Sequence, residues 1–554
     1  MWRTRAKKRA ALLTAAILVP LTGTACAGPS TGTPNTTGIP AATGTPVDGG
    51  VIEYGHEQEP PCAHAGWVQN AYLARQYLDN LVSEADDGTV VPWLATGWDI
   101  SPDRRSYTFH LRDDVEFTDG TRLDAAAVKY NMDRYLNEKT ANTTVVSYLK
   151  PYFASDSAVD DFTYRIDLRT PYEPLLTALS QGYFGIQSPT ALERGPQINC
   201  TAPVGSGPFI LKKWERNRQI TFVRNPKYNS APANARHQGP PYVDKLIWKF
   251  LKDPVSRYGS LTSGSSDAVY NVPVIDWADA ATEFQLSQYL TGGRPNTISM
   301  NVTHAPFDDV RVRRAFAHSA DRRTAVRTAF RGVIPFNGNG ALSSSTPDYD
   351  PAFDDTYRHD PATAARLLDE AGWNQRDSNG IRTKNGKPLH ATLVYAADAV
   401  IGPEGAAVLQ DIAAQARDVG FDIQLVPATQ SEYFGGKYAP ADTFNGYVGY
   451  WTSPTAGLLY INWRQRLPDQ PNPDNTAYYN NPELQHTIEL ANSTADPAGR
   501  RRYYSKAQQI ISDQAVSIGL YPQTTSIAVS PRLRDVWIEK SQGEPVFADA
   551  RFIR

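Results

Sequence analysis

The pattern of apolar and polar positions divides the chain into a leader, a polar segment and a long body. Five basic residues lie between Arg3 and Arg9, and an apolar run follows from Ala10 to Leu21. Small residues then occupy positions 22–25. This order is typical of an export signal, and the apolar run is shorter than the ~20 residues that span a bilayer. We expect residues 1–25 to be a signal peptide.

The segment after the leader is built to stay extended and polar. Residues 27–50 are almost entirely Gly, Ser, Thr, Pro and Ala, with no aromatic side chain. Such a composition buries too little apolar surface to fold, so we expect residues 26–50 to be a flexible tether. The segment ending at Cys26 resembles a bacterial lipoprotein signal, which implies a lipid on that cysteine. Gly23 departs from the leucine usual in that pattern, and cleavage to a free secreted protein is the alternative.

The body alternates between strand-like and helix-like patterns. Residues 50–55 are predicted to form a strand, and residues 67–82 have apolar positions at helical spacing. Segments 98–101 and 106–112 flank a Pro-Asp-Arg-Arg turn and predict a hairpin. A helix is expected to begin after Asp124, which would cap it.

Size, charge and cysteine content narrow the class of protein. The body of about 500 residues predicts two or more domains. Without the leader the chain has 50 basic and 58 acidic residues, a balance of −8 that argues against a nucleic-acid partner. Besides Cys26 there are Cys62 and Cys200, which predict one disulfide in an oxidising compartment, with two buried thiols as the alternative. No Cys-x-x-Cys or His-x-x-x-His spacing occurs, and we expect no metal site and no cofactor.

Several segments in order carry a resemblance to a known family. They are residues 92–98, 107–112, 115–120, 203–209, 225–228, 306–315, 319–322, 359–361 and 367–373. Together they resemble the family 5 extracellular solute-binding proteins, which serve ATP-binding cassette importers for oligopeptides, dipeptides, nickel chelates and some saccharides. The resemblance extends over about residues 49–546.

The resemblance implies an α/β fold of two lobes, of the type II periplasmic-binding-protein kind, that close on a ligand by hinge motion. It also implies an extra subdomain in the first lobe. The expected division is 51–73, 171–299 and 514–548 for the first lobe, 74–170 for the extra subdomain, and 300–513 for the second lobe.

Most residues of the matching segments are expected to have structural roles. We expect Gly205 and Gly207 to adopt backbone torsions closed to other residues. We expect Arg311, Arg313 and Arg322 to face solvent or to pair with nearby aspartates on helix surfaces.

Two loops are the candidates for binding ligand between the lobes, together with a few single residues. The candidates are Glu57, Glu59, His64 and Trp67 after the first strand, Tyr447, Tyr450, Trp451, Thr452 and Ser453 in the second lobe, and Asn271, Asn301, Arg464 and Arg466, with Tyr433 as a weaker one. Each has an alternative as a core, turn or surface residue, and Tyr447 and Tyr450 alternate as in a half-buried strand.

The second-lobe loop departs from the peptide-binding members of the family. The matching loop of those proteins contributes an aspartate to the peptide's amino terminus, but no Asp or Glu lies between Asp442 and Asp469 here. A buried ammonium without a partner is costly. We therefore expect free di- and tripeptides to bind poorly and a peptide-like solute with flat or apolar faces to bind better.

The resulting hypothesis is a monomeric, lipid-anchored binding protein that delivers a peptide or peptide-like solute to an ATP-binding cassette permease at the outer face of the cell membrane. A sensor on the same scaffold, or a binder of a saccharide or metal chelate, is the alternative. The chain has no Gly-x-Ser-x-Gly or His-Glu-x-x-His motif, so we do not expect an enzyme.

Overall fold

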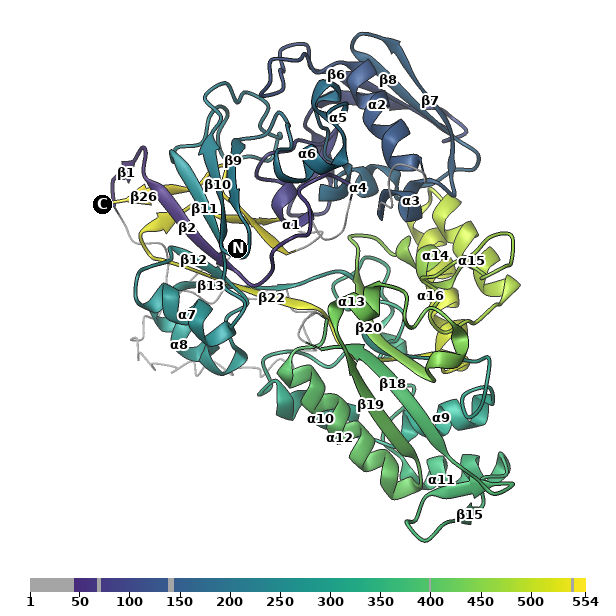
Figure 1. Ribbon diagram of the computed structural model, residues 1–554. Coiled ribbons are helices and arrows are strands. Elements are labelled where there is room, and N and C mark those ends of the chain that lie inside the picture. The colour runs from purple at the N-terminus through teal and green to yellow at the C-terminus, as the bar shows by residue number, and fades with distance from the viewer. Residues whose placement is uncertain (1–43, 67–70, 138–143, 398–399, 540–542) are drawn as a thin grey trace, which may run out of the picture. The chain divides into compact units, whose positions relative to one another are not determined.

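The computed structural model of the protein describes residues 44–66, 71–137, 144–397, 400–539 and 543–554 (Figure 1). Two large β-sheets and a smaller one organise this part of the chain. None of the helices in these ranges combines the length and the apolar character that a membrane crossing requires.

The largest sheet has seven strands in the order β13-β22-β12-β2-β11-β10-β9. β2 (Val51–His56) runs parallel to its neighbours β11 and β12 and confirms the strand predicted at 50–55. The other strands are β9 (Phe209–Glu215), β10 (Gln219–Arg224), β11 (Lys245–Phe250), β12 (Ala268–Tyr270), β13 (Gln285–Leu290) and β22 (Thr524–Val529). Helices α7 (Pro254–Thr262) and α8 (Trp277–Glu283) pack beside β12 and β13.

The second sheet has five strands in the order β19-β18-β20-β14-β21. They are β14 (Gly293–Met300), β18 (His390–Ala396), β19 (Asp422–Ala428), β20 (Gly446–Thr452) and β21 (Ser517–Tyr521). The accompanying helices are α9 (Val310–His318), α10 (Arg322–Ala329), α11 (Pro361–Glu370) and α12 (Pro403–Val419). α12 lies along β19 and contacts α10, as Figure 1 shows.

The chain passes between these two sheets at two short links. Thr291 and Gly292 join β13 to β14, and Pro522 and Gln523 join β21 to β22. The links lie side by side, because the Thr291 amide donates to the Gln523 carbonyl at 2.8 Å. β14 and β21 belong to the five-stranded sheet, although the sequence division assigned residues 293–299 and 514–521 to the first lobe. We therefore propose that the hinge lies at the two links.

A four-stranded sheet, in the order β5-β6-β8-β7, lies within the range 74–170 predicted for the extra subdomain. β5 (Ala95–Ile100) and β6 (Ser106–Leu111) form the predicted hairpin. The other strands are β7 (Phe153–Asp160) and β8 (Thr163–Leu168). Helix α2 (Ala125–Leu136) packs on β7 and β8, and the Asp124 side chain accepts from the Ala127 amide, so the predicted cap is confirmed.

The remaining elements are short or pack at the edges of the sheets. The helices are α1 (Ala71–Ala74), α3 (Thr144–Leu149), α4 (Leu175–Leu179), α5 (Pro189–Leu192), α6 (Pro196–Thr201), α13 (Gln430–Phe434), α14 (Leu458–Trp463), α15 (Pro482–Ser493) and α16 (Pro497–Asp513), with 3-10 turns η2 (Gly182–Phe184), η3 (Val274–Asp276), η4 (Pro351–Phe353) and η5 (Ala441–Thr443). The strands are β1 (Pro46–Val47), β3 (Val82–Glu84), β4 (Val90–Pro92), β15 (Gln375–Arg376), β16 (Arg382–Lys384), β17 (Lys387–Pro388), β23 (Leu533–Arg534), β24 (Trp537–Glu539), β25 (Glu544–Val546) and β26 (Arg551–Ile553).

The long helix predicted at 67–82 is wrong for the described residues 71–82. α1 ends at Ala74, and every residue from 71 to 82 is buried, so the segment has no solvent face. Its polar side chains bond to neighbouring parts of the chain instead: Arg75 Nη1 donates to Asn80 Oδ1 at 2.8 Å, and Asn80 Nδ2 donates to the Leu179 and Gln181 carbonyls. These tertiary bonds override the helical spacing.

Gly205 and Gly207 are needed for space rather than for torsion. Neither has a positive φ, so the predicted torsional role is wrong. A Cβ at Gly205 would overlap the Tyr77 carbonyl oxygen, and one at Gly207 would lie 2.5 Å from the Tyr77 carbonyl carbon. The glycines therefore let this segment pack directly on the backbone of residues 77–78.

Two of the three arginines placed on helix surfaces are buried. Arg311 pairs with Asp309 as expected. Arg313 and Arg322 are each 3 % exposed, and their guanidinium groups donate to backbone carbonyls, those of Phe307 and Gly519 among them. The prediction of surface pairing is wrong for these two, because their guanidinium groups bond backbone carbonyls inside the protein.

The N-terminal part of the described chain is fastened at two places. Pro46 and Val47 pair with Ile553 and Phe552, so ordered structure begins within the segment expected to be a tether. The structure contains a disulfide between Cys62 and Cys200, next to a 2.8 Å hydrogen bond from the Ala63 amide to the Cys200 carbonyl.

Asp79 is fully buried, and its ionisation is expected to lower stability. Its Oδ2 accepts from Ser206 Oγ at 2.9 Å and from Ser230 Oγ at 2.6 Å, yet burial raises its pKa to about 6. Because the folded state holds this proton more tightly than the unfolded state does, the contribution of Asp79 to stability falls as pH rises from 4 through 6.

The free energy of unfolding of Asp79→Asn, relative to that of wild type, is therefore expected to be about 2 kcal/mol higher at pH 7.5 than at pH 4.5. Urea unfolding of both proteins at the two pH values measures this difference. An equal effect at both pH values would contradict it.

Candidate functional site

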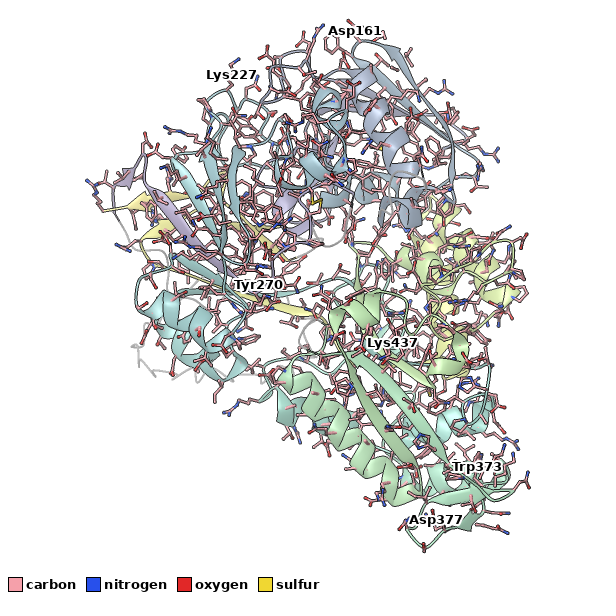
Figure 2. The ribbon with its side chains drawn as sticks, in the orientation of Figure 1. Asp161, Lys227, Tyr270, Trp373, Asp377 and Lys437 are labelled. Atoms are coloured by element: carbon pink, nitrogen blue, oxygen red, sulfur yellow. A yellow bond between two sulfur atoms is a disulfide. The ribbon has the colours of Figure 1, made fainter. Side chains whose placement is uncertain are left out.

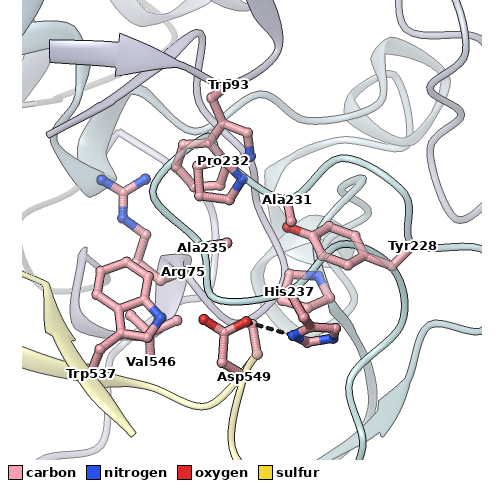
Figure 3. A pocket seen from close by; sticks show the side chains of 12 residues that line it. Arg75, Trp93, Tyr228, Ala231, Pro232, Ala235, His237, Trp537, Val546 and Asp549 are labelled. Atoms are coloured by element: carbon pink, nitrogen blue, oxygen red, sulfur yellow. Dashed lines mark hydrogen bonds and ion pairs between the residues drawn. The ribbon is translucent and has the colours of Figure 1, made fainter. Parts of the chain in front are cut away.

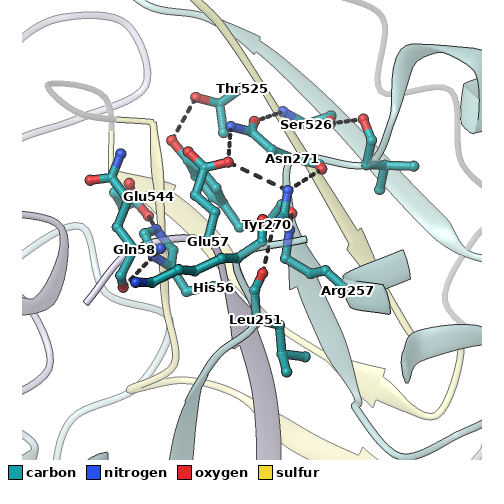
Figure 4. A network of polar contacts seen from close by, with 12 residues as sticks. His56, Glu57, Gln58, Leu251, Arg257, Tyr270, Asn271, Thr525, Ser526 and Glu544 are labelled. Carbon is teal, nitrogen blue, oxygen red and sulfur yellow. Dashed lines mark hydrogen bonds and ion pairs between the residues drawn. The ribbon is translucent and has the colours of Figure 1, made fainter. Parts of the chain in front are cut away.

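Glu57 and Asn271, both predicted site residues, lie together at the end of β2 (Figure 4). Glu57 Oε2 accepts from Asn271 Nδ2 at 3.1 Å and lies 3.4 Å from Arg257 Nη2. Arg257 in turn donates to the Tyr270 and Leu251 carbonyls. Figure 2 marks Tyr270 at the same place in the ribbon. The Glu57 charge is thus held by Arg257 of α7 and by Asn271, which follows β12.

Tyr450 links this network to the second sheet. Burial, with the nearby charges of Glu57 and Glu544, raises the pKa of the Tyr450 phenol above its usual value. The Glu544 carboxylate is itself 3.6 Å from His56 Nε2, and burial raises its pKa as well. Tyr450 of β20 therefore lies within electrostatic range of the carboxylates near the end of β2.

Three candidates of the first loop differ in where they lie. Glu59 accepts from Trp214 Nε1 at 2.8 Å and from the Asn217 amide at 2.9 Å, which fastens the loop to the β9–β10 turn. His64 is 4 % exposed, and burial lowers its pKa to about 4, so its ring is neutral at neutral pH. Trp67 lies outside the described residues.

β20 presents its aromatic side chains on alternate faces. Tyr447 stacks on Tyr433 of α13, with ring centroids 4.4 Å apart. On the same face, the Trp451 indole donates from Nε1 to Tyr148 Oη at 3.2 Å, and that hydroxyl donates to the Thr452 carbonyl at 3.2 Å. Tyr148 belongs to α3, so α3 contacts the second sheet at Trp451 and Thr452.

The other second-lobe candidates lie in turns or directly after a strand or helix. Ser453 is buried, and its Oγ donates to the Thr455 carbonyl at 3.1 Å. Asn301 is also buried, at the end of β14, and donates to the Ala441 carbonyl at 2.8 Å. Arg464 is partly buried and reaches the Pro471 carbonyl at 3.4 Å.

Arg294 and Asp474 join this group and were missed in the sequence. Arg294, the second residue of β14, is 6 % exposed, and Tyr433, Asp474 and Tyr447 act on its charge. Burial raises the pKa of Asp474 to about 6, and Arg294, Arg464 and Arg466 act against this rise. The available signal was a charged residue inside a strand whose other residues are uncharged, GRPNTISM.

Asp474 also lies just beyond the segment in which the sequence argument found no carboxylate. The poor binding of free di- and tripeptides stays a prediction for titration to test.

A cavity elsewhere in the structure is too small to hold a solute (Figure 3). It is lined by Arg75, Trp93, Tyr228, His237 and Asp549 among others, and its volume is about 10 Å³. That is room for no more than about one water molecule. Among the described residues, no group of three or more His, Cys, Asp or Glu side chains is placed to hold a metal ion.

Comparison with known proteins gives relatives that match most of the chain. The glutathione-binding protein GsiB of Salmonella typhimurium is 29% identical over 486 residues, which is 85% of this chain and 88% of that protein. GsiB of Escherichia coli O1:K1 / APEC is 28% identical over 465 residues, 81% of this chain and 84% of that protein.

Solved structures also match. NikA from Brucella suis, in complex with Fe(III)-EDTA, has a TM-score of 0.75 at 26% identity and covers 90% of this chain and 99% of its own. The periplasmic binding protein DppA from Helicobacter pylori, in complex with the peptide STSA, has a TM-score of 0.77 at 20% identity, covering 92% and 99%, and supports the fold alone. The family model described as bacterial extracellular solute-binding proteins, family 5 middle, matches residues 89–481, so this chain belongs to the family 5 bacterial extracellular solute-binding proteins.

Proposed function

We propose that this protein captures a small peptide-like solute between its two large sheets and delivers it to an ATP-binding cassette permease, without altering it chemically. Family membership and relatives named for glutathione binding support this class of solute. The observation that carries the proposal is the group of aromatic and charged side chains on the neighbouring strands β14 and β20, which includes Arg294, Tyr447, Tyr450 and Trp451. Such a mixture of flat apolar faces and a few directed polar groups is typical of small-molecule sites.

The protein is further proposed to work as a monomer at the outer face of the cell membrane, held by a lipid on Cys26. The basic, apolar and small-residue order of the leader supports export, and the cysteine at its end supports the anchor. A lipid chain and a polar spacer would keep the binding body near a membrane partner.

One mass-spectrometry experiment tests both parts. Protein purified without denaturation from its own membranes is expected to release, under native conditions, a bound molecule of peptide-like mass. The denatured chain is expected to begin at Cys26 with added acyl mass. A saccharide or metal chelate as cargo would contradict the proposed solute, and an unacylated chain would contradict the anchor.

Trp451→Ala is expected to weaken binding of that cargo at least tenfold, about 1.4 kcal/mol. Trp451 is half-buried and packs against two hydrophobic clusters, which supports a ring that keeps part of its surface for solute while it holds α3 against β20. Isothermal titration calorimetry with the identified cargo measures the loss.

Tyr148→Phe is the matched control, because it removes the hydroxyl that the indole bonds and keeps the ring. A Trp451→Ala affinity equal to that of wild type would assign Trp451 to the core alone.

A further inference from the structure

Arg294 differs from the other deeply buried arginines of the described chain in having no protein partner. The deeply buried arginines are Arg75, Arg257, Arg294, Arg313, Arg322 and Arg382. Apart from Arg294, each donates to at least one backbone carbonyl. Among the described residues, the Arg294 guanidinium has no hydrogen bond, ion pair or cation–π contact, and its Nε is buried without an acceptor.

A buried guanidinium without a partner lowers the stability of the folded protein. A cation removed from water costs several kcal/mol unless an opposite charge and hydrogen bonds replace the lost hydration. Burial also lowers the pKa of Arg294. Because folded proteins satisfy buried polar groups, an unsatisfied one at a site marks a group whose partner is a ligand.

The side chains around Arg294 leave an excess of positive charge. Arg294, Arg464, Arg466 and the Ser147 hydroxyl all act on Asp474 and oppose the rise in its pKa. Asp474 is not within ion-pair distance of Arg294, so it lessens the positive potential without occupying the guanidinium. The stacked rings of Tyr433 and Tyr447 complete this group.

We propose that Arg294 binds a carboxylate of the solute through two parallel hydrogen bonds, so that the cargo is a peptide-like acid. A planar guanidinium matches a carboxylate in this geometry, whereas an amide or ester offers it no charge. A phosphate is a poorer match, since its second negative charge would face Asp474. The inference rests on the proposed function, because it names the chemical class of the solute at the same site.

The test uses glutathione and its diethyl ester, which share the peptide frame, amine and thiol and differ in their two carboxylates. Calorimetry of wild-type protein freed of cargo is expected to give at least tenfold tighter binding of the acid. Arg294→Met is expected to weaken glutathione binding at least tenfold and to bring the ratio of acid to ester close to one. Arg294→Lys is expected to keep part of the preference for acid over ester, because lysine keeps the positive charge but lacks the paired N–H donors of the guanidinium.

Lys437→Met is the matched control for loss of a positive charge. Lys437 follows α13 at the surface, pairs with Glu432, and is marked in Figure 2. It is expected to leave the ratio of acid to ester unchanged. Competition with inorganic phosphate tests whether Arg294 binds anions without selectivity. Displacement of glutathione by phosphate at equal concentration would overturn the assignment to a carboxylate.

Thermal unfolding of the cargo-free variants gives a second readout that needs no ligand. Arg294→Met is expected to melt at or above the wild-type temperature, whereas Arg313→Met, which removes bonded donors, is expected to melt well below it. A large loss of stability in Arg294→Met, or a retained preference for the acid, would overturn the inference while leaving the proposed function intact. Wild-type protein that binds neither probe would agree with the predicted poor binding of free tripeptides, and the melting temperature of Arg294→Met would then decide the inference.

Discussion

Removal of the disulfide by the double change Cys62→Ser and Cys200→Ser is expected to lower the unfolding free energy by about 4 kcal/mol. The bond closes a sequence separation of 138 residues, and a cross-link over such a loop restricts the unfolded chain strongly, by roughly 4–5 kcal/mol in the chain-entropy model. The hydrogen bond from the Ala63 amide to the Cys200 carbonyl is expected to persist but not to compensate. Urea unfolding followed by circular dichroism measures the loss.

The reductant dithiothreitol supplies the control for this change. Wild-type protein in reductant is expected to unfold at the same urea concentration as the double variant without reductant. The urea midpoint of the double variant is expected to be the same with and without reductant. A wild-type midpoint that reductant does not shift would show that the bond contributes nothing.

Gly293→Ala is expected to destabilise the protein by at least about 3 kcal/mol and to abolish tight solute binding. Gly293 has φ +122°, and a Cβ there would overlap the Trp451 carbonyl oxygen and lie 2.7 Å from the Ser453 amide nitrogen. Strained torsion alone costs roughly 1–3 kcal/mol, and separation of β14 from β20 would also move Arg294 and Trp451. Thermal unfolding and calorimetry with the identified cargo measure the two effects.

Gly386→Ala separates torsion from collision. Gly386 has φ +75° with open space where its Cβ would lie, so it is expected to cost only about 1 kcal/mol and to leave binding intact. Equal costs at the two positions would mean that the close approach at Gly293 has no energetic weight.

The fold was predictable from the sequence because the segments that resemble the solute-binding family occur in the family's order along the chain. Local signals succeeded where one segment decides the outcome: the hairpin at 98–112, the Asp124 cap and the first strand are all confirmed. The helix at 67–82 failed because its buried polar residues bond to segments about 100 residues away, which spacing does not reveal.

The site was predictable only in part, for the same physical reason. The aromatic loop around Trp451 was visible as a run of rings, and Glu57 and Asn271 were both named, but their mutual pairing depends on the sheet that brings β2 and β12 together. Arg294 and Asp474 are 180 positions apart, and only the folded chain brings them into one group. The roles of Gly205, Gly207, Arg313 and Arg322 were also predicted wrongly. A close approach between backbone segments, or a buried carbonyl that needs a donor, leaves no local pattern in the sequence.

The order of strands in the seven-stranded sheet has a consequence for how the chain is made. β22, from residues 524–529, lies between β13 and β12, whereas every strand of the five-stranded sheet comes from the continuous stretch 293–521. As a chain leaves the ribosome or the export channel from its N-terminus, the five-stranded sheet can therefore assemble before the first sheet is complete. Until β22 is made, the first sheet lacks the strand that lies between β13 and β12. During this interval holding chaperones would have unpaired strand edges to protect.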